Sequence, residues 1–185
     1  MFKKIVFGVF SSLLIFGSVT PVFAKTVYKA PVVAAPTPTP VATVNSFEMF
    51  WPLVAGKTIE SKLYSLKLLK EKIRGFLIFG KAQKADYEIF LGIKRMLEAE
   101  VLMKANNSDL ANKTLDKAIA TFQSASANLD AAKASGDIPQ NVKDEINTRV
   151  NNLKKFVGFL IAQNKNYKDK LQSVLDVLNQ ISSKI

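Results

Sequence analysis

The chain has 185 residues, 26 basic and 15 acidic side chains, no histidine, no cysteine and a formal net charge of +11. The lack of histidine and cysteine excludes the commonest general base, the usual transition-metal ligands, thiolate nucleophiles and disulfide bonds. The carboxylates do not follow the Glu-x-x-His spacing of metal sites in helical bundles. We therefore expect no enzymatic activity, no cofactor and no metal site.

The N-terminus has the pattern of a secretory signal. Lys3 and Lys4 precede an uncharged, mostly apolar run over residues 5–19, and small residues surround the expected cleavage point after Ala24. This apolar run is shorter than the roughly 20 residues that cross a bilayer as a helix. We predict a signal peptide over residues 1–24 and an extracytoplasmic protein, secreted or associated with the cell envelope. An uncleaved N-terminal anchor is the alternative.

A change of composition separates the signal from the predicted domain. Residues 25–46 are rich in proline, alanine and threonine, which favours an extended, disordered linker. An aromatic cluster formed by Phe47, Phe50 and Trp51 then opens a helical domain predicted over residues 47–185. We expect this cluster to cap one end of the bundle, with an exposed anchor for a membrane or a partner as the alternative.

Apolar side chains recur every three or four residues through most of the remaining chain, which is the spacing of amphipathic helices. The predicted fold is all-α, an antiparallel bundle of about four helices with a long C-terminal helix. The helices are expected at about residues 58–79, 81–105, 108–134 and 139–184. In the first of them, one stripe is assigned to the core: Leu63, Leu66, Leu69, Ile73, Phe76 and Leu77.

The last predicted helix is longer than the bundle. Residues 140–184 would extend about 67 Å as one helix, against about 33 to 40 Å for the preceding helices. We favour a continuous or gently bent helix, with a bend near Gly158 or around residues 164–166 as the alternative. Its overhanging apolar stripe would be the candidate surface for self-association, unless the stripe packs back on the first helix. The self-association candidates are Tyr167, Leu171, Val174, Leu178 and Ile181.

The first predicted helix is also strongly basic. Between Lys57 and Arg74 the chain has six cations against two glutamates. A basic amphipathic helix is typical of proteins that bind anionic lipid surfaces, and the candidate contacts are Lys62, Lys67, Lys70 and Arg74. The same pattern also fits a helix whose apolar side chains are core and whose lysines are solvated. The cation excess suits an anionic membrane or wall polymer, and we do not expect nucleic acid as a partner.

Part of the chain resembles a known family. Three groups of residues carry the resemblance: Leu63, Tyr64, Leu66, Lys67, Leu68, Lys70, Glu71, Lys72 and Ile73; the run from Phe76 to Gly80 with Lys81, Lys84, Ala85, Asp86 and Tyr87; and Lys94 with Arg95, Met96, Leu97, Glu98, Ala99 and Glu100. Over about residues 60–135 they resemble a bacterial extracytoplasmic domain of unknown function. Members usually have a proline before the tyrosine and often Asp-Pro at the next helix entry, where this chain has Lys62-Leu63 and Gly80-Lys81.

The resemblance implies an exported or membrane-anchored helical domain with no assigned activity. Together with the composition, it leads us to expect a non-enzymatic interaction or structural module of the bacterial cell envelope. Its partner would be an unidentified protein or a second copy. The alternative function is peripheral binding of an anionic membrane or wall polymer through the basic helix.

Overall fold

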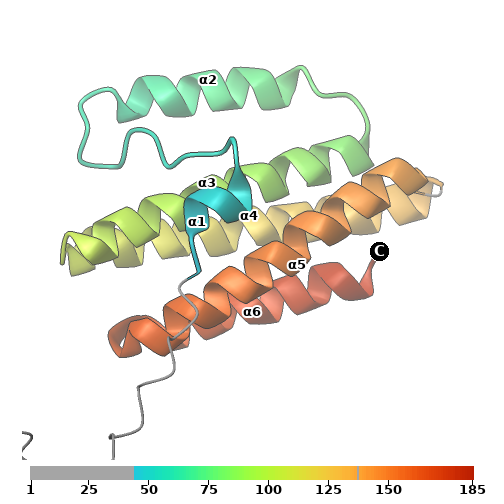
Figure 1. Ribbon diagram of the computed structural model, residues 1–185. Helices are drawn as coiled ribbons and strands as arrows, with labels where there is room; N and C mark the ends of the chain where they lie inside the picture. The colour runs from blue at the N-terminus through green and yellow to red at the C-terminus, as the bar shows by residue number, and fades with distance from the viewer. Residues whose placement is uncertain (1–43, 137) are drawn as a thin grey trace, which may run out of the picture. The chain divides into compact units, whose positions relative to one another are not determined.

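The computed structural model of the protein describes residues 44–136 and 138–185 (Figure 1). The predicted signal peptide over residues 1–24 and nearly all of the predicted linker over residues 25–46 lie outside these residues. The described residues form helices joined by loops, with no strand among them, so the predicted all-α bundle is confirmed. No helix in these two ranges is both long and apolar enough to cross a membrane.

Four antiparallel helices form a closed ring: α3 (Lys81–Lys104), α4 (Ser108–Ser135), α5 (Gln140–Gln163) and α6 (Lys168–Ser183) (Figure 1). Helix α3 packs on α4 and α5, and α6 packs on the same two helices. One apolar core lies between them, because each helix turns its apolar stripe inward. Fully buried side chains come from all four helices: Ile89, Met96, Leu115, Phe122, Leu129, Ile146, Phe156 and Leu171.

The chain reverses direction within the segment that was expected to be one continuous or gently bent helix. Helix α5 ends at Gln163, one 3-10 turn follows (η1, Lys165–Tyr167), and α6 runs back along α4 and α5. At the bend, the side-chain amide of Asn164 donates a hydrogen bond to the carbonyl oxygen of Leu160 at 3.1 Å. The preference for a continuous helix is therefore wrong. The bend lies around residues 164–166, whereas α5 passes through Gly158 without interruption.

The reversal explains why the residues predicted to mediate self-association are buried. Tyr167, Leu171, Val174, Leu178 and Ile181 are each at most 8% exposed. They pack within the monomer on α4 and α5, because folding back hides from water the stripe that a straight helix would leave overhanging. Their assignment to a surface is wrong, and so is the alternative that they pack on the first predicted helix.

The aromatic cluster near the start of the domain serves two roles. Helix α1 (Ser46–Phe50) is little more than one turn, and its Phe50 is buried edge-to-face against Phe156 of α5, with ring centroids 5.4 Å apart. Phe47 and Trp51 contact each other edge-to-face and stay exposed. One ring therefore packs on the bundle, as expected, and two remain at the surface.

Helices α3 and α4 approach closely at Gly92, where an ideal Cβ atom would lie 2.2 Å from Cε1 of Phe122. We expect Gly92→Ala to lower the free energy of unfolding by about 1–3 kcal/mol, because the added methyl group overpacks the core. The matched control is Gly158→Ala on α5, where a Cβ atom meets nothing within 4 Å. It should raise stability by up to about 1 kcal/mol. Urea unfolding measures both, and a Gly92→Ala variant as stable as the wild type would contradict the close contact.

Candidate functional site

Helix α2 (Tyr64–Phe76) lies outside the ring, alongside α3 (Figure 1). Seven apolar side chains on and next to this helix face solvent, with exposed fractions between 53% and 85%. We call them the outer stripe: Leu63, Leu66, Leu69, Ile73, Phe76, Leu77 and Phe79. The assignment of the first six to the core is therefore wrong. Several exposed apolar side chains along one helix are typical of interaction sites rather than of ordinary protein surface.

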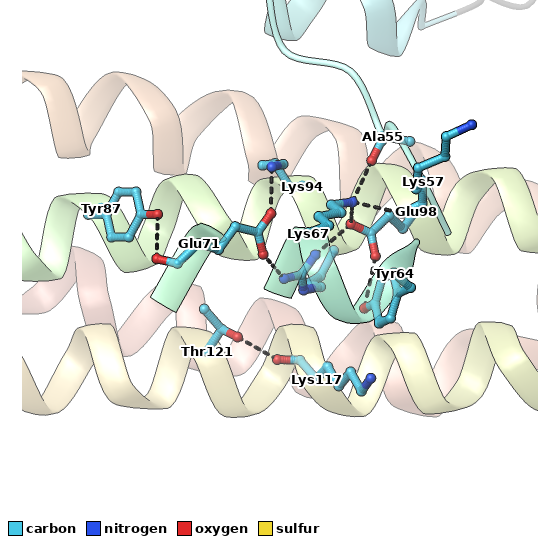
Figure 2. A network of polar contacts seen from close by, with 11 residues as sticks. Ala55, Lys57, Tyr64, Lys67, Glu71, Tyr87, Lys94, Glu98, Lys117 and Thr121 are labelled. Atoms are coloured by element: carbon cyan, nitrogen blue, oxygen red, sulfur yellow. Dashed lines mark hydrogen bonds and ion pairs between the residues drawn. The ribbon is translucent and has the colours of Figure 1, made fainter. Parts of the chain in front are cut away.

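The face of α2 that contacts α3 is polar instead (Figure 2). Glu71 accepts a hydrogen bond from Nζ of Lys94 at 2.5 Å and a second one from Nη2 of Arg95. Through Nη1, Arg95 also donates to Oε1 of Glu98 at 2.6 Å. The two helices are therefore joined by ion pairs at their interface. We call this set the α2 network: Tyr64, Lys67, Glu71, Lys94, Arg95 and Glu98.

Glu98 is the most deeply placed member of the α2 network, with a side chain that has no exposed area. Its Oε1 accepts hydrogen bonds from Arg95 and from Nζ of Lys67. The same ammonium group donates to the carbonyl oxygens of Ala55 at 2.8 Å and Lys57 at 2.9 Å. Lys67 therefore ties the segment before α2 to the α2–α3 interface (Figure 2).

Two tyrosines complete the interface. The phenol of Tyr64 donates to Oε2 of Glu98 at 3.3 Å, and Nζ of Lys117 on α4 lies 4.9 Å from the centroid of the Tyr64 ring. Tyr87 donates to the backbone carbonyl of Glu71 at 3.0 Å. Burial raises the pKa of Tyr64 from its ordinary value of 10.0 to about 12, which moves the ionisation of this phenol further above neutral pH.

The charges of the α2 network stabilise one another. Burial alone raises the pKa of Glu71, but the hydrogen bond from Lys94 and the charge of Arg95 outweigh it and hold this pKa below the ordinary value of 4.5. Burial likewise works to lower the pKa of Arg95, yet Glu98 and Glu71 raise it overall. For Lys67 burial dominates and lowers the pKa, although Glu98 opposes the shift. Removing one partner would leave the others buried without compensation.

The structure separates the four predicted contacts to an anionic surface. Lys62, Lys70 and Arg74 are exposed, and no carboxylate among the described residues lies within ion-pair distance of them. Lys67 is held in the α2 network, so its assignment to a binding surface is wrong. Arg95 and Glu98, which the sequence pattern does not single out as site residues, are buried at this interface. The sequence signal for this buried interface is on α2. Its polar residues Tyr64, Lys67 and Glu71 recur every three or four positions, as regularly as its apolar residues do.

Two grooves flank the contact between α2 and α3. The first has a volume of about 380 Å³ and includes the exposed cations Lys57, Lys70 and Arg74. The second, of about 420 Å³, lies on the other side of α2 and includes Lys72 and Phe76. Among residues 44–136 and 138–185 there is no cluster of three acidic side chains placed to hold a metal ion.

These features define an all-α domain in which a closed four-helix ring carries an outer amphipathic helix on buried ion pairs. Residues 56–184 match the family model described as Domain of unknown function (DUF5667), and the chain belongs to this family. The match confirms the resemblance to a family of unknown function and extends it beyond residues 60–135 to the end of α6. No curated protein and no solved structure matches the chain.

We expect Glu98→Gln to weaken the docking of α2, because it leaves Lys67 and Arg95 buried with only one carboxylate between them. Removing one partner of a buried ion pair costs about 3–5 kcal/mol. Hydrogen exchange should show the loss of protection in α2 but not in α3–α6. Glu145→Gln is the control, since the side chain of Glu145 is 53% exposed and its pair with Arg149 is worth about 1 kcal/mol or less. Equal loss of protection in all helices would contradict a local role.

Acidification is expected to release α2 from α3. Because the pKa of Glu71 is lower in the folded protein than its ordinary value of 4.5, the unfolded state binds more protons near this pH. The stabilising contribution of Glu71 is therefore full above about pH 4.5 and is lost as the pH falls through the lowered value. NMR signals of α2 should change in this range. Glu71→Gln should remove that pH dependence, and its persistence would show that another group is responsible.

Proposed function

We propose that the protein is an exported, non-enzymatic interaction module of the bacterial cell envelope that attaches to an anionic membrane surface through α2. The observation that carries the proposal is the outward orientation of the outer stripe. An amphipathic helix in a folded domain normally turns its apolar face to the core. Here the ion pairs hold the polar face inward, so the apolar face is available to a partner.

The exposed charges around the outer stripe select the partner. Lys62, Lys70, Lys72 and Arg74 lie next to the stripe, and the only acidic residue of α2, Glu71, is buried in the α2 network. A second copy placed on this face would bring cations against cations. Anionic headgroups neutralise them, while the acyl region accepts the apolar side chains. A hydrophilic wall polymer offers no complement to seven exposed apolar side chains, so the membrane is the better partner.

The expected free energy of membrane binding has an electrostatic and a hydrophobic contribution. A lysine or arginine near an anionic bilayer contributes about 1 kcal/mol, and salt screens this attraction over about 8–10 Å. Full burial of a leucine, isoleucine or phenylalanine side chain contributes about 1.5–3 kcal/mol. Several inserted side chains therefore outweigh the four cations, so salt should weaken the attachment without abolishing it.

We expect the purified full-length protein to co-sediment with vesicles that contain phosphatidylglycerol. Ile73→Ser, which removes an apolar side chain from the outer stripe, should weaken binding at least tenfold, since a loss of about 1.4 kcal/mol corresponds to that factor. Val101→Ser is the matched control. It is another β-branched, exposed helical residue, but it lies on α3. It should change binding less than twofold.

The apolar run over residues 5–19 is identical in both variants, so their difference reports on α2 alone. Equal loss of binding in Ile73→Ser and Val101→Ser would contradict attachment through the outer stripe. Equal binding of wild type to phosphatidylcholine vesicles would contradict selection by charge. Light scattering should show a monomer without vesicles, and a dimer lost on Ile73→Ser would assign the stripe to a second copy instead.

A further inference from the structure

We propose that the groove between α2, α3 and residues 54–57 binds the phosphate headgroup of a single anionic lipid. The inference rests on the proposed membrane attachment and names the ligand that the attached protein would take. The groove has a volume of about 380 Å³, which falls within the range of small-ligand sites. The groove is lined by Val54, Ala55, Gly56, Lys57, Lys67, Lys70, Glu71, Arg74, Tyr87, Phe90 and Lys94.

The net positive charge of the groove favours an anionic ligand. Five cationic side chains line it against one carboxylate, that of Glu71. Lys67 and Lys94 are paired with Glu98 and Glu71, respectively. The other three, Lys57, Lys70 and Arg74, have no ion-pair partner among the described residues. The only carboxylate is held by Lys94 and Arg95, so it does not cancel the unpaired charges.

Arg74 is positioned for a phosphate group. Its guanidinium carbon lies 5.5 Å from the ring centroid of Tyr87 and 5.8 Å from that of Phe90, within the range of cation–π contacts. The two rings are themselves stacked, with centroids 6.0 Å apart. A guanidinium held over aromatic rings keeps its donor edges free, and its planar fork matches the oxygens of a phosphate bidentately.

The location of the groove favours a lipid over a soluble phosphate ester. Lys70 and Arg74 line the groove and also neighbour the outer stripe. Ile73 follows Lys70 by three residues, and Leu77, the C-cap of α2, follows Arg74 by three. A phosphate bound by these cations therefore lies beside the face that we expect to enter the acyl region. Val54 and Phe90 add apolar lining on the groove side. A lipid can contact both the cations and the neighbouring apolar side chains, whereas a free phosphate ester can contact only the cations.

The test compares two charge-matched double variants of the full-length protein. Lys70→Gln/Arg74→Gln removes two cations from the groove, and Lys62→Gln/Lys72→Gln removes two from the same region outside it. Each is titrated by NMR with dihexanoyl phosphatidylglycerol below its micelle concentration. Wild type should bind with shifts at Val54 and Phe90. The groove variant should bind at least tenfold more weakly, and the control variant should stay within twofold of wild type.

Equal weakening by the two double variants would overturn the inference, because it would mean diffuse attraction rather than a site. The absence of shifts at Val54 and Phe90 in the wild type would also overturn it. Glycerol 3-phosphate that binds as tightly as the lipid would overturn the lipid assignment and leave a site for soluble phosphate esters. Dihexanoyl phosphatidylcholine should bind more weakly, and equal affinity would contradict selection by net charge.

Two combinations separate this inference from the proposed function. Vesicle binding that depends on Ile73, without a response to monomeric lipid, would remove the headgroup site and leave the membrane attachment standing. A groove that binds monomeric lipid in a protein whose vesicle binding is unaffected by Ile73→Ser would remove the attachment through the outer stripe. Ile73→Ser should leave the affinity for monomeric lipid within threefold of wild type.

Discussion

The charged surface of α3 that faces away from the ring determines how α2 lies. Once Arg95 and Glu98 are withdrawn from water, their lost hydration must be replaced by partners of opposite charge and by hydrogen bonds. Lys67, Glu71 and Tyr64 supply them. An apolar face laid on this surface would bury the Arg95–Glu98 pair without the further hydrogen bonds and charges that Lys67, Glu71 and Tyr64 provide. The inverted orientation of α2, with leucine and phenylalanine outside, follows from the electrostatics of its neighbour rather than from its own amphipathicity.

This explains how far the sequence could predict the fold. The stripes of α4 and α5 could be identified because the apolar residues that form them are core residues, and regular spacing identifies such a face. The orientation of α2 could not be predicted. The spacing of Leu66, Leu69 and Ile73 identifies an apolar face, but it does not show whether that face contacts the core or solvent. For the candidate site, charge alone predicts Lys62, Lys70 and Arg74 as contacts, and all three are exposed. The pairing of Lys67 with Glu98 could not be predicted, because the two residues are 31 positions apart in the sequence.

In the hairpin of α5 and α6, too, the sequence identifies an apolar stripe without showing what the stripe packs against. The sequence shows the excess length of the segment from residue 140, and Asn164 belongs to the range in which a bend is the alternative to a continuous helix. A straight overhang and a reversal bury the same stripe, one against a partner and the other against α4 and α5. The choice depends on whether the monomer has a face open to receive α6. That face exists, and Lys184 fastens the far end of α6 to α4 through Asp130 at 2.6 Å and the hydroxyl of Ser126 at 2.7 Å.

The closure of the ring without α2 has a consequence for how such a domain can diversify. The seven side chains of the outer stripe are absent from the core, so substitutions among them do not alter its packing. The same scaffold can therefore carry outer helices of different hydrophobicity and charge, provided that the positions of Tyr64, Lys67 and Glu71 keep their polar side chains. Affinity for a surface and stability of the fold are thus free to evolve on separate sets of residues.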